Sequence, residues 1–138
     1  MNAKDTVVTY TERVWNEGDI DALDDLCADP MLRHEAGGCV SLTLEEQRER
    51  VRSSREVMAS PDGRNVRFDS VLLTGDGDDV CAVYDMTVPS DSDFARSGAL
   101  PSETVGDEIH VCSVEVFRVV DGKITEVWNS PAMPGHWG

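Results

Sequence analysis

One acidic residue of this chain lies where an acidic side chain is costly. Glu115 belongs to residues 111–117, an otherwise apolar segment with the pattern of a β-strand. Burying a carboxylate there costs free energy unless the group is paired or protonated. If its face of the strand, shared with Ser113 and Phe117, lines a pocket, burial should raise the pKa of Glu115 and permit proton transfer near neutral pH. The alternatives are that this face meets solvent or that an arginine on a neighbouring strand pairs with Glu115.

His34 and Glu35 form a second pair of ionisable side chains, at the end of a predicted strand over residues 31–34. A carboxylate at the mouth of an apolar cavity can act as a general base, and a histidine can do so by its intrinsic pKa. Neighbouring side chains on a strand point to opposite faces, so at most one of the two is expected to point into a pocket. The alternative is that both are exposed loop residues.

Further polar and aromatic side chains are predicted to bind a substrate: Trp15, Tyr84, His110, Trp128 and Asn129. The three aromatic rings could form a pocket wall, although Trp15 fits an ordinary core equally well. His110 lies on the strand of Glu115 but on its opposite face, so both can face one pocket only if a bulge intervenes. A packed or hydrogen-bonded His110 is the alternative. Asn129 could orient a ligand through its amide.

Composition excludes several classes of protein. The chain has 138 residues, 40% of them apolar, and a net charge of −15, which fits one globular domain over residues 1–138. The acidity argues against nucleic acid or an anionic membrane as a partner. There is no apolar run of about 18 residues and no signal-peptide pattern, so we expect a cytoplasmic protein. The four cysteines show no metal-ligand spacing, and His110 with Cys112 would supply too few ligands for a metal site.

Helices are predicted before most of the strands. Apolar spacing predicts a helix over residues 6–16, and Gly18 supplies the backbone conformation that ends it. A short helix is predicted at residues 20–28. Thr43 opens a capping box, which predicts a polar surface helix that reaches about residue 60.

Strands are predicted at residues 31–34, 66–74, 80–88, 109–120 and 124–128. The Asp121-Gly122 pair is a strong signal for a tight hairpin turn between the last two. A long segment, residues 89–106, separates the predicted strand 80–88 from the predicted strand 109–120. Segments of this length are typical of a lid, a binding loop or a disordered segment. The order predicts an α+β fold, in which the helices close a curved antiparallel sheet around a conical pocket.

Two segments resemble one large family. The first is Trp15-Asn16-Glu17-Gly18-Asp19, continuing through Ala28-Asp29-Pro30 to His34-Glu35, and the second is Val116-Phe117-Arg118 with the turn and strand that follow. Both resemble the cone-shaped, cystatin-like proteins of the nuclear transport factor 2-like superfamily, especially SnoaL-like polyketide cyclases and ketosteroid isomerases. The resemblance implies that Glu35 occupies the position of the catalytic base, Glu115 that of a second acid, and His34 that of a histidine found in the cyclases.

The chain also departs from these relatives. Tyr10 is one residue out of register with the tyrosine of the isomerases, and Glu replaces Asp at both acidic positions. The Arg-x-Asp pairing that resembles limonene-epoxide hydrolases is missing after Arg118. These departures count against a steroid isomerase.

The sequence therefore predicts a cofactor-free acid–base enzyme, of the isomerase or cyclase type, for a hydrophobic oxygenated small molecule such as a polyketide or terpenoid. Glu35, alone or with His34, is the expected base, and a protonated Glu115 is expected to stabilise an oxyanion. The alternatives are a non-catalytic small-molecule-binding or dimerisation module and an epoxide hydrolase. A homodimer is expected, because an open sheet face would expose apolar surface and the resemblance implies pairing.

Overall fold

The computed structural model describes residues 1–98, 104–135 and 137. Its helices are α1 (Ala3–Tyr10), the π-helical continuation η1 (Thr11–Asn16), the 3-10 helix η2 (Ile20–Ala22), α2 (Leu23–Leu26), α3 (Leu44–Val57) and α4 (Asp93–Arg96). The three predicted helices are thus confirmed, with shifted ends. The first begins early because Asn2 caps it in a capping box with Asp5, and Thr43 caps α3 as predicted. Of the predicted long loop, residues 99–103 lie outside the described residues.

The strands are β1 (Cys27–Glu35), β2 (Gly38–Leu42), β3 (Arg67–Asp76), β4 (Asp79–Pro89), β5 (Thr104–Val105), β6 (Glu108–Val120), β7 (Lys123–Asn129) and β8 (Met133–Pro134). They form one sheet in the order β2-β1-β7-β6-β4-β3, and β5 and β8 pair with β6. The predicted antiparallel pairing is found between most neighbouring strands, and β1 and β7 are the exception, because they run parallel. Parallel pairing needs a long connection between the strands, and here most of the chain lies between them.

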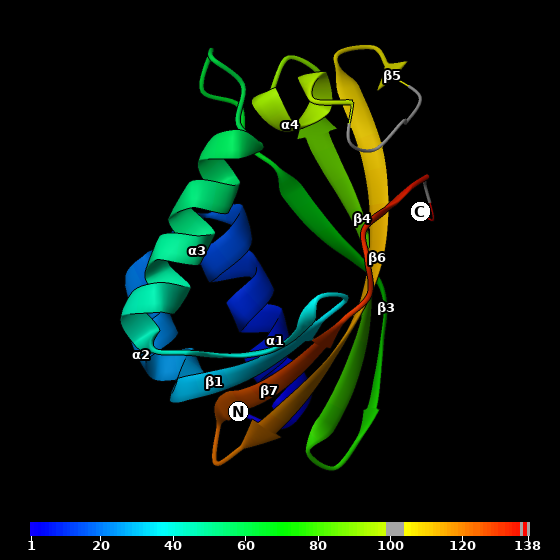
Figure 1. Cartoon of the computed structure of the whole chain (residues 1–138). Coiled ribbons are helices and arrows are strands. Elements are labelled where there is room, and N and C mark those ends of the chain that lie inside the picture. The colour runs from blue at the N-terminus through cyan, green and yellow to red at the C-terminus, as the bar shows by residue number, and fades with distance from the viewer. Residues whose placement is uncertain (99–103, 136, 138) are drawn as a thin grey trace.

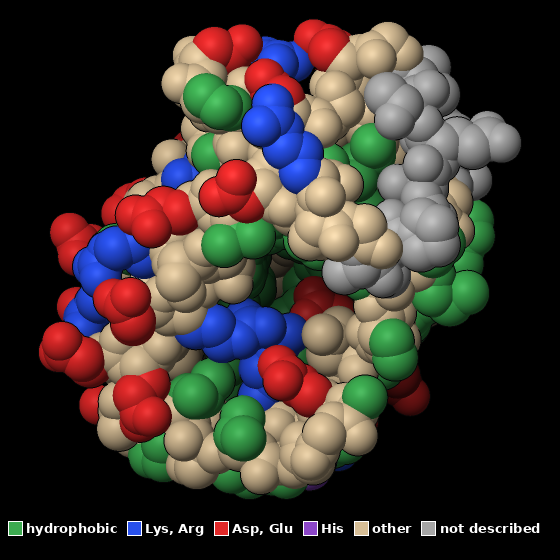
Figure 2. Space-filling model, turned by 45° about the horizontal axis from the view of Figure 1, so that its top comes forward, with side chains coloured by type: hydrophobic (Ala, Val, Ile, Leu, Met, Phe, Trp, Pro, Cys, Tyr) green, Lys and Arg blue, Asp and Glu red, His purple; other side chains and the backbone are tan. Residues whose placement is uncertain are grey.

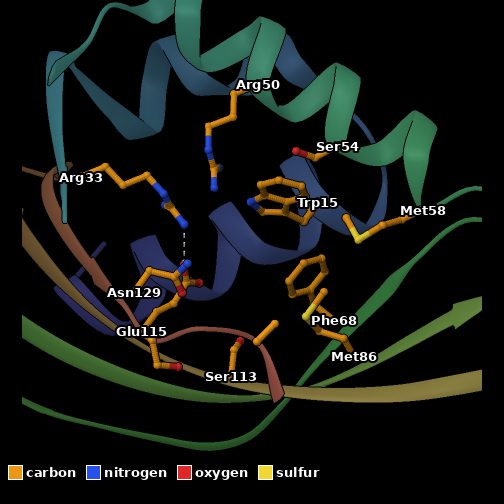
Figure 3. A pocket seen from close by; sticks show the side chains of 12 residues that line it. Trp15, Arg33, Arg50, Ser54, Met58, Phe68, Met86, Ser113, Glu115 and Asn129 are labelled. Atoms are coloured by element: carbon orange, nitrogen blue, oxygen red, sulfur yellow. Dashed lines mark hydrogen bonds and ion pairs between the residues drawn. The ribbon is translucent and has the colours of Figure 1, made fainter. Parts of the chain in front are cut away.

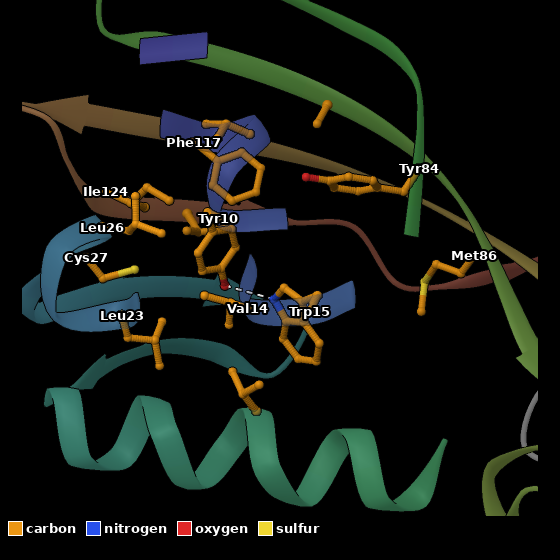
Figure 4. Packing of buried hydrophobic residues seen from close by; sticks show 14 of the residues in the cluster. Tyr10, Val14, Trp15, Leu23, Leu26, Cys27, Tyr84, Met86, Phe117 and Ile124 are labelled. Carbon is orange, nitrogen blue, oxygen red and sulfur yellow. Dashed lines mark hydrogen bonds between the residues drawn. The ribbon is translucent and has the colours of Figure 1, made fainter. Parts of the chain in front are cut away.

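The sheet curves around the helices and gives the α+β fold that the sequence predicts. In Figure 1, α1, α2 and α3 lie on the concave side of the sheet, and the long strands β4 and β6 extend beyond them toward α4. The core between the two layers contains Val14 and Leu23 from the helices and Phe117 and Ile124 from the sheet, all almost fully buried (Figure 4). Burial of these two amphipathic layers against each other is what drives such folds.

The hairpin between β6 and β7 determines which side chains lie opposite each other near the concave face. Asp121 and Gly122 have φ values of 52° and 77°, as the predicted two-residue turn requires. This turn and a register shift after Arg118 place Asn129 opposite Glu115.

Both tyrosines of the chain lie in the core, and we expect neither side chain to ionise near pH 10, the ordinary pKa of tyrosine. Burial raises the pKa of Tyr10 from 10.0 to about 12, and burial also raises the pKa of Tyr84, whose hydroxyl lies 2.7 Å from that of Thr11. A raised pKa in the folded state gives a stabilisation that is complete below pH 10 and is lost at higher pH. An absorbance titration should therefore show tyrosinate only together with alkaline unfolding. A reversible tyrosinate signal with a midpoint near pH 10 in the folded protein would contradict this packing.

In the part of the chain that the structure describes, no helix is long and apolar enough to cross a membrane.

Candidate functional site

A cavity of about 140 Å³ lies between the helices and the concave face of the sheet (Figure 3). Its apolar end carries Trp15 from η1, Phe68 from β3, Met86 from β4 and Met58, which follows α3. The remaining lining residues are Arg33, Arg50, Ser54, Ser113, Glu115, Asn129, Ser130 and Ala132. Figure 2 shows a hollow in the displayed face of the molecule, with basic and acidic side chains together at its edge. The cavity thus joins an apolar surface to a compact charged cluster.

The charged cluster is built around Arg33 on β1, whose side chain is only 4% exposed. Its Nε donates to Oε1 of Glu35 at 2.6 Å, and its Nη2 donates to Oε1 of Glu115 at 3.0 Å. Burial alone would lower the pKa of Arg33, but the negative charge of Glu115 and the hydrogen bonds that Arg33 donates to both carboxylates raise it. Arg33 is therefore a permanent positive charge between two carboxylates.

Glu115 on β6 projects into the cavity with its side chain 13% exposed. Asn129 on β7 lies beside it, and one orientation of the Asn129 amide satisfies both charged neighbours: Nδ2 donates to Glu115 Oε1 at 3.2 Å, and Oδ1 accepts from Arg33 at 3.1 Å. Both contacts of the Glu115 carboxylate fall on Oε1. Within the described residues, Oε2 has no hydrogen-bond donor, which leaves this oxygen to interact with a ligand.

Arg50 reaches the same cavity from α3 (Figure 3). Its guanidinium lies 5.9 Å from the ring centre of Trp15, and its Nη2 donates to Glu35 at 3.4 Å. Burial lowers the pKa of Arg50, and the nearby charge of Arg33 lowers it further. Compared with Arg33, this guanidinium is loosely held.

The structure brings together three of the residues predicted from sequence: Glu115, Asn129 and Trp15 all line the cavity. Glu115 accepts a hydrogen bond from Arg33 in an ion pair, and the protonated role expected of it stays a prediction. This ion pair is the arginine pairing that the sequence left open as an alternative.

Glu35 lies at the rim, 40% exposed, and is not among the residues that line the cavity. The hydrogen bond from Arg33 lowers the pKa of Glu35 below its ordinary value, and Arg50 lowers it further. Glu35 thus holds the two arginines from outside the lining of the cavity, and its expected role as the general base stays a prediction.

The other predicted site residues do not reach the cavity. The ring of His34 stacks on that of Trp128 at 5.0 Å, and its Nε2 lies 2.6 Å from Oε2 of Glu126, because strand alternation turns His34 away from the face of Arg33. His110 lies 3.5 Å from Asp85 on the face opposite Glu115, and no bulge reverses it. Tyr84 is part of the core.

Sequence reasoning missed both cavity arginines. Arg50 belongs to a helix that was predicted to be polar and to lie on the surface, yet Gln47, Val51 and Ser54 show the spacing of one inward-facing stripe beside it. Arg33 could have been found from its position two residues before Glu35, which puts both side chains on one face of the strand.

Among the described residues, no group of three or more His, Cys, Asp or Glu side chains could hold a metal ion.

A curved sheet closed by helices around a cavity is the architecture of nuclear transport factor 2-like proteins, and this chain has it. Within this class, the chain belongs to the SnoaL-like domain family, whose model matches residues 7–127.

Solved structures agree with this assignment. A candidate polyketide cyclase from Acidithiobacillus ferrooxidans is 27% identical with a TM-score of 0.73, over 92% of this chain and 85% of that one. The candidate polyketide cyclase IdmH from Streptomyces antibioticus is 18% identical with a TM-score of 0.71, over 94% and 91% of the two chains. An epoxide hydrolase of M. tuberculosis that resembles limonene-epoxide hydrolases is 17% identical with a TM-score of 0.61, over 93% and 80%. No protein of curated function matches the chain.

Proposed function

We propose that this protein is a cofactor-free enzyme that isomerises or cyclises a hydrophobic, oxygenated small molecule, such as a polyketide or terpenoid, by proton transfer. The observation that carries the proposal is the Glu115–Arg33 ion pair, which lines a cavity with an apolar end. The similarity to candidate polyketide cyclases supports the substrate class. Apolar walls exclude water and strengthen the electrostatic interactions of the few polar groups inside.

In this mechanism Glu115 is the general base. Its Oε2 takes a proton from a carbon next to a carbonyl group, the C–H electron pair moves into the new C=C bond, and the carbonyl oxygen becomes an enolate. Negative charge thus moves from Glu115 to the substrate while Arg33 stays beside both. The hydroxyl of Ser113, on the same strand face, can donate to the enolate. Return of the proton at another carbon gives isomerisation, and attack of the enolate carbon on an electrophile gives ring closure.

Exchange with solvent deuterium tests this step without knowledge of the natural product. The protein would be incubated in heavy water with a panel of cyclic ketones and 1,3-dicarbonyl compounds, and loss of the acidic C–H signal would be followed by NMR. We expect exchange above background with the wild-type protein and none with Glu115→Gln. Exchange that persists in the variant would reject Glu115 as the base.

Hydrolysis of an epoxide is a second candidate. It needs a carboxylate with hydrogen-bonding partners that can hold a water molecule, and Glu115, Asn129 and Ser113 together offer such a set. The product distinguishes epoxide hydrolysis from isomerisation or cyclisation, because only hydrolysis yields a diol that contains one oxygen from water. Ligand binding with neither product would favour the non-catalytic binding module.

We also propose that the protein forms a homodimer. Large apolar side chains remain exposed on strands of the sheet, among them Leu32 on β1 and Leu72 on β3. Covering such side chains with a second copy removes apolar area from water. Light scattering after size-exclusion chromatography should give twice the mass of one chain, and the mass of one chain at all concentrations would contradict the dimer.

A further inference from the structure

The cavity is basic in a protein that is strongly acidic. The chain has 12 Lys and Arg against 27 Asp and Glu, yet Arg33 and Arg50 both project into one cavity whose lining contains a single carboxylate, Glu115. The mechanism above uses Arg33 and gives no role to Arg50. Arg50 is partly removed from water, which costs free energy, and its ion pair with Glu35 is long at 3.4 Å. Arg50 therefore requires an explanation.

The hydrogen bonds of the two arginines differ. A guanidinium has five N–H donors. Arg33 donates at 2.6 Å and 3.0 Å to two carboxylates. Arg50, within the described residues, makes one hydrogen bond, which is 3.4 Å long and goes to the exposed carboxylate of Glu35. The side chain of Arg50 is 31% exposed, and that of Arg33 is 4% exposed. Arg50 therefore presents accessible donors on the open side of the cavity.

We propose that the ligand of this cavity carries a carboxylate and that Arg50 binds it. This inference deepens the proposed function, since it names a charged group on the substrate. The planar fork of a guanidinium matches a carboxylate in geometry and charge. The apolar end, with Trp15, Phe68 and Met86, takes the ring or chain of the ligand. The cavity volume of about 140 Å³ is close to that of a cavity that holds one benzene ring, about 150 Å³, so a ligand the size of benzoate is a suitable probe.

Glu35 gives this proposal a distinctive signature. Its Oε1 is the acceptor for both Arg33 and Arg50, so an incoming carboxylate competes with Glu35 for Arg50. Removing the charge of Arg50 should weaken anion binding, and removing the charge of Glu35 should strengthen it. If the Arg50–Glu35 contact were purely structural, loss of either charge would change the affinity for the anion in the same direction.

Calorimetric titration with benzoate and with benzamide, its uncharged analogue of nearly equal shape, tests the proposal. We expect the wild-type protein to bind benzoate about tenfold more tightly than benzamide, as one charge-assisted contact implies. Arg50→Gln should abolish this preference, and Arg50→Lys, which keeps the charge and loses the fork, should retain part of it. Glu35→Gln should bind benzoate several-fold more tightly. The matched control is Arg52→Gln, since Arg52 lies on the same helix, is more than half exposed and pairs with Glu49; it should bind like the wild type.

Several results would overturn the proposal. Benzoate binding that is no tighter than benzamide binding, including no binding of either, would show that the cavity does not select an anion. A benzoate preference that survives in Arg50→Gln would place the anion elsewhere. Melting curves of each variant identify loss of fold, and in that case Arg50→Lys decides. Because none of these readouts requires turnover, failure of the carboxylate proposal leaves the Glu115 chemistry intact, and loss of proton exchange in Glu115→Gln leaves the anion preference to be measured.

Discussion

Glu115→Gln is expected to lower kcat about a thousandfold, within the range found for loss of a general base, while the protein remains folded. Glutamine keeps the shape of the side chain and can still accept the hydrogen bond of Arg33 through its amide oxygen. It cannot take a proton from the substrate. The loss should therefore appear in kcat and leave the affinity for a bound ligand largely unchanged.

Two further variants separate a chemical role of Glu115 from a structural one. Glu115→Asp keeps a carboxylate one methylene farther from the substrate and should recover part of the activity. Glu126→Gln makes the same exchange on the opposite face of the sheet, where Glu126 contacts His34, and should leave kcat near the wild-type value. If Glu115→Gln turns over within tenfold of the wild type, Glu115 is not the base.

The position of Glu115 at the cavity was accessible from sequence because it depends on local pattern. A carboxylate in an apolar strand must be buried with a partner or face a cavity, and alternation correctly places Ser113 on its face and His110 on the other. The Asp121-Gly122 turn was equally readable, and it helps to place Asn129 against Glu115.

The partner of Glu115 was not accessible in the same way. Arg33 reaches Glu115 because β1 lies parallel to β7 and β7 lies between β1 and β6. No local pattern specifies a parallel pairing between strands separated by most of the chain. The same pairing sets His34 beside Trp128 on the outer face, so the histidine that the family resemblance suggested is turned away from the cavity.

Arg33→Met is expected to destabilise the fold by about 3 kcal/mol, as removal of one partner from a buried ion pair does. Methionine roughly fills the apolar volume of the arginine stem but leaves the carboxylate of Glu115, 13% exposed, without its cation. The free energy of unfolding from urea titration measures the loss. Arg48→Met, which removes an arginine paired with Asp24 at the surface of the same protein, should cost less than about 1 kcal/mol.

The double variant Arg33→Met with Glu115→Gln shows whether that cost comes from the unpaired charge. Glu115→Gln should be mildly destabilising in the wild type but stabilising beside Arg33→Met, with a coupling energy of about 2 kcal/mol. Additivity of the two substitutions within about 0.5 kcal/mol would mean that lost packing, not the uncompensated carboxylate, explains the single variant.

Acid provides a second check of the stabilisation by Arg33, through Glu35, whose pKa Arg33 lowers from its ordinary 4.5. The stabilisation from the Arg33–Glu35 contact is present above pH 4.5 and is lost as the pH falls through the lower pKa that Glu35 has in the folded protein. The difference in stability between the wild type and Arg33→Met should therefore narrow on acidification. A difference that stays constant at low pH would exclude the charge of Glu35 as a contributor to the stabilisation by Arg33.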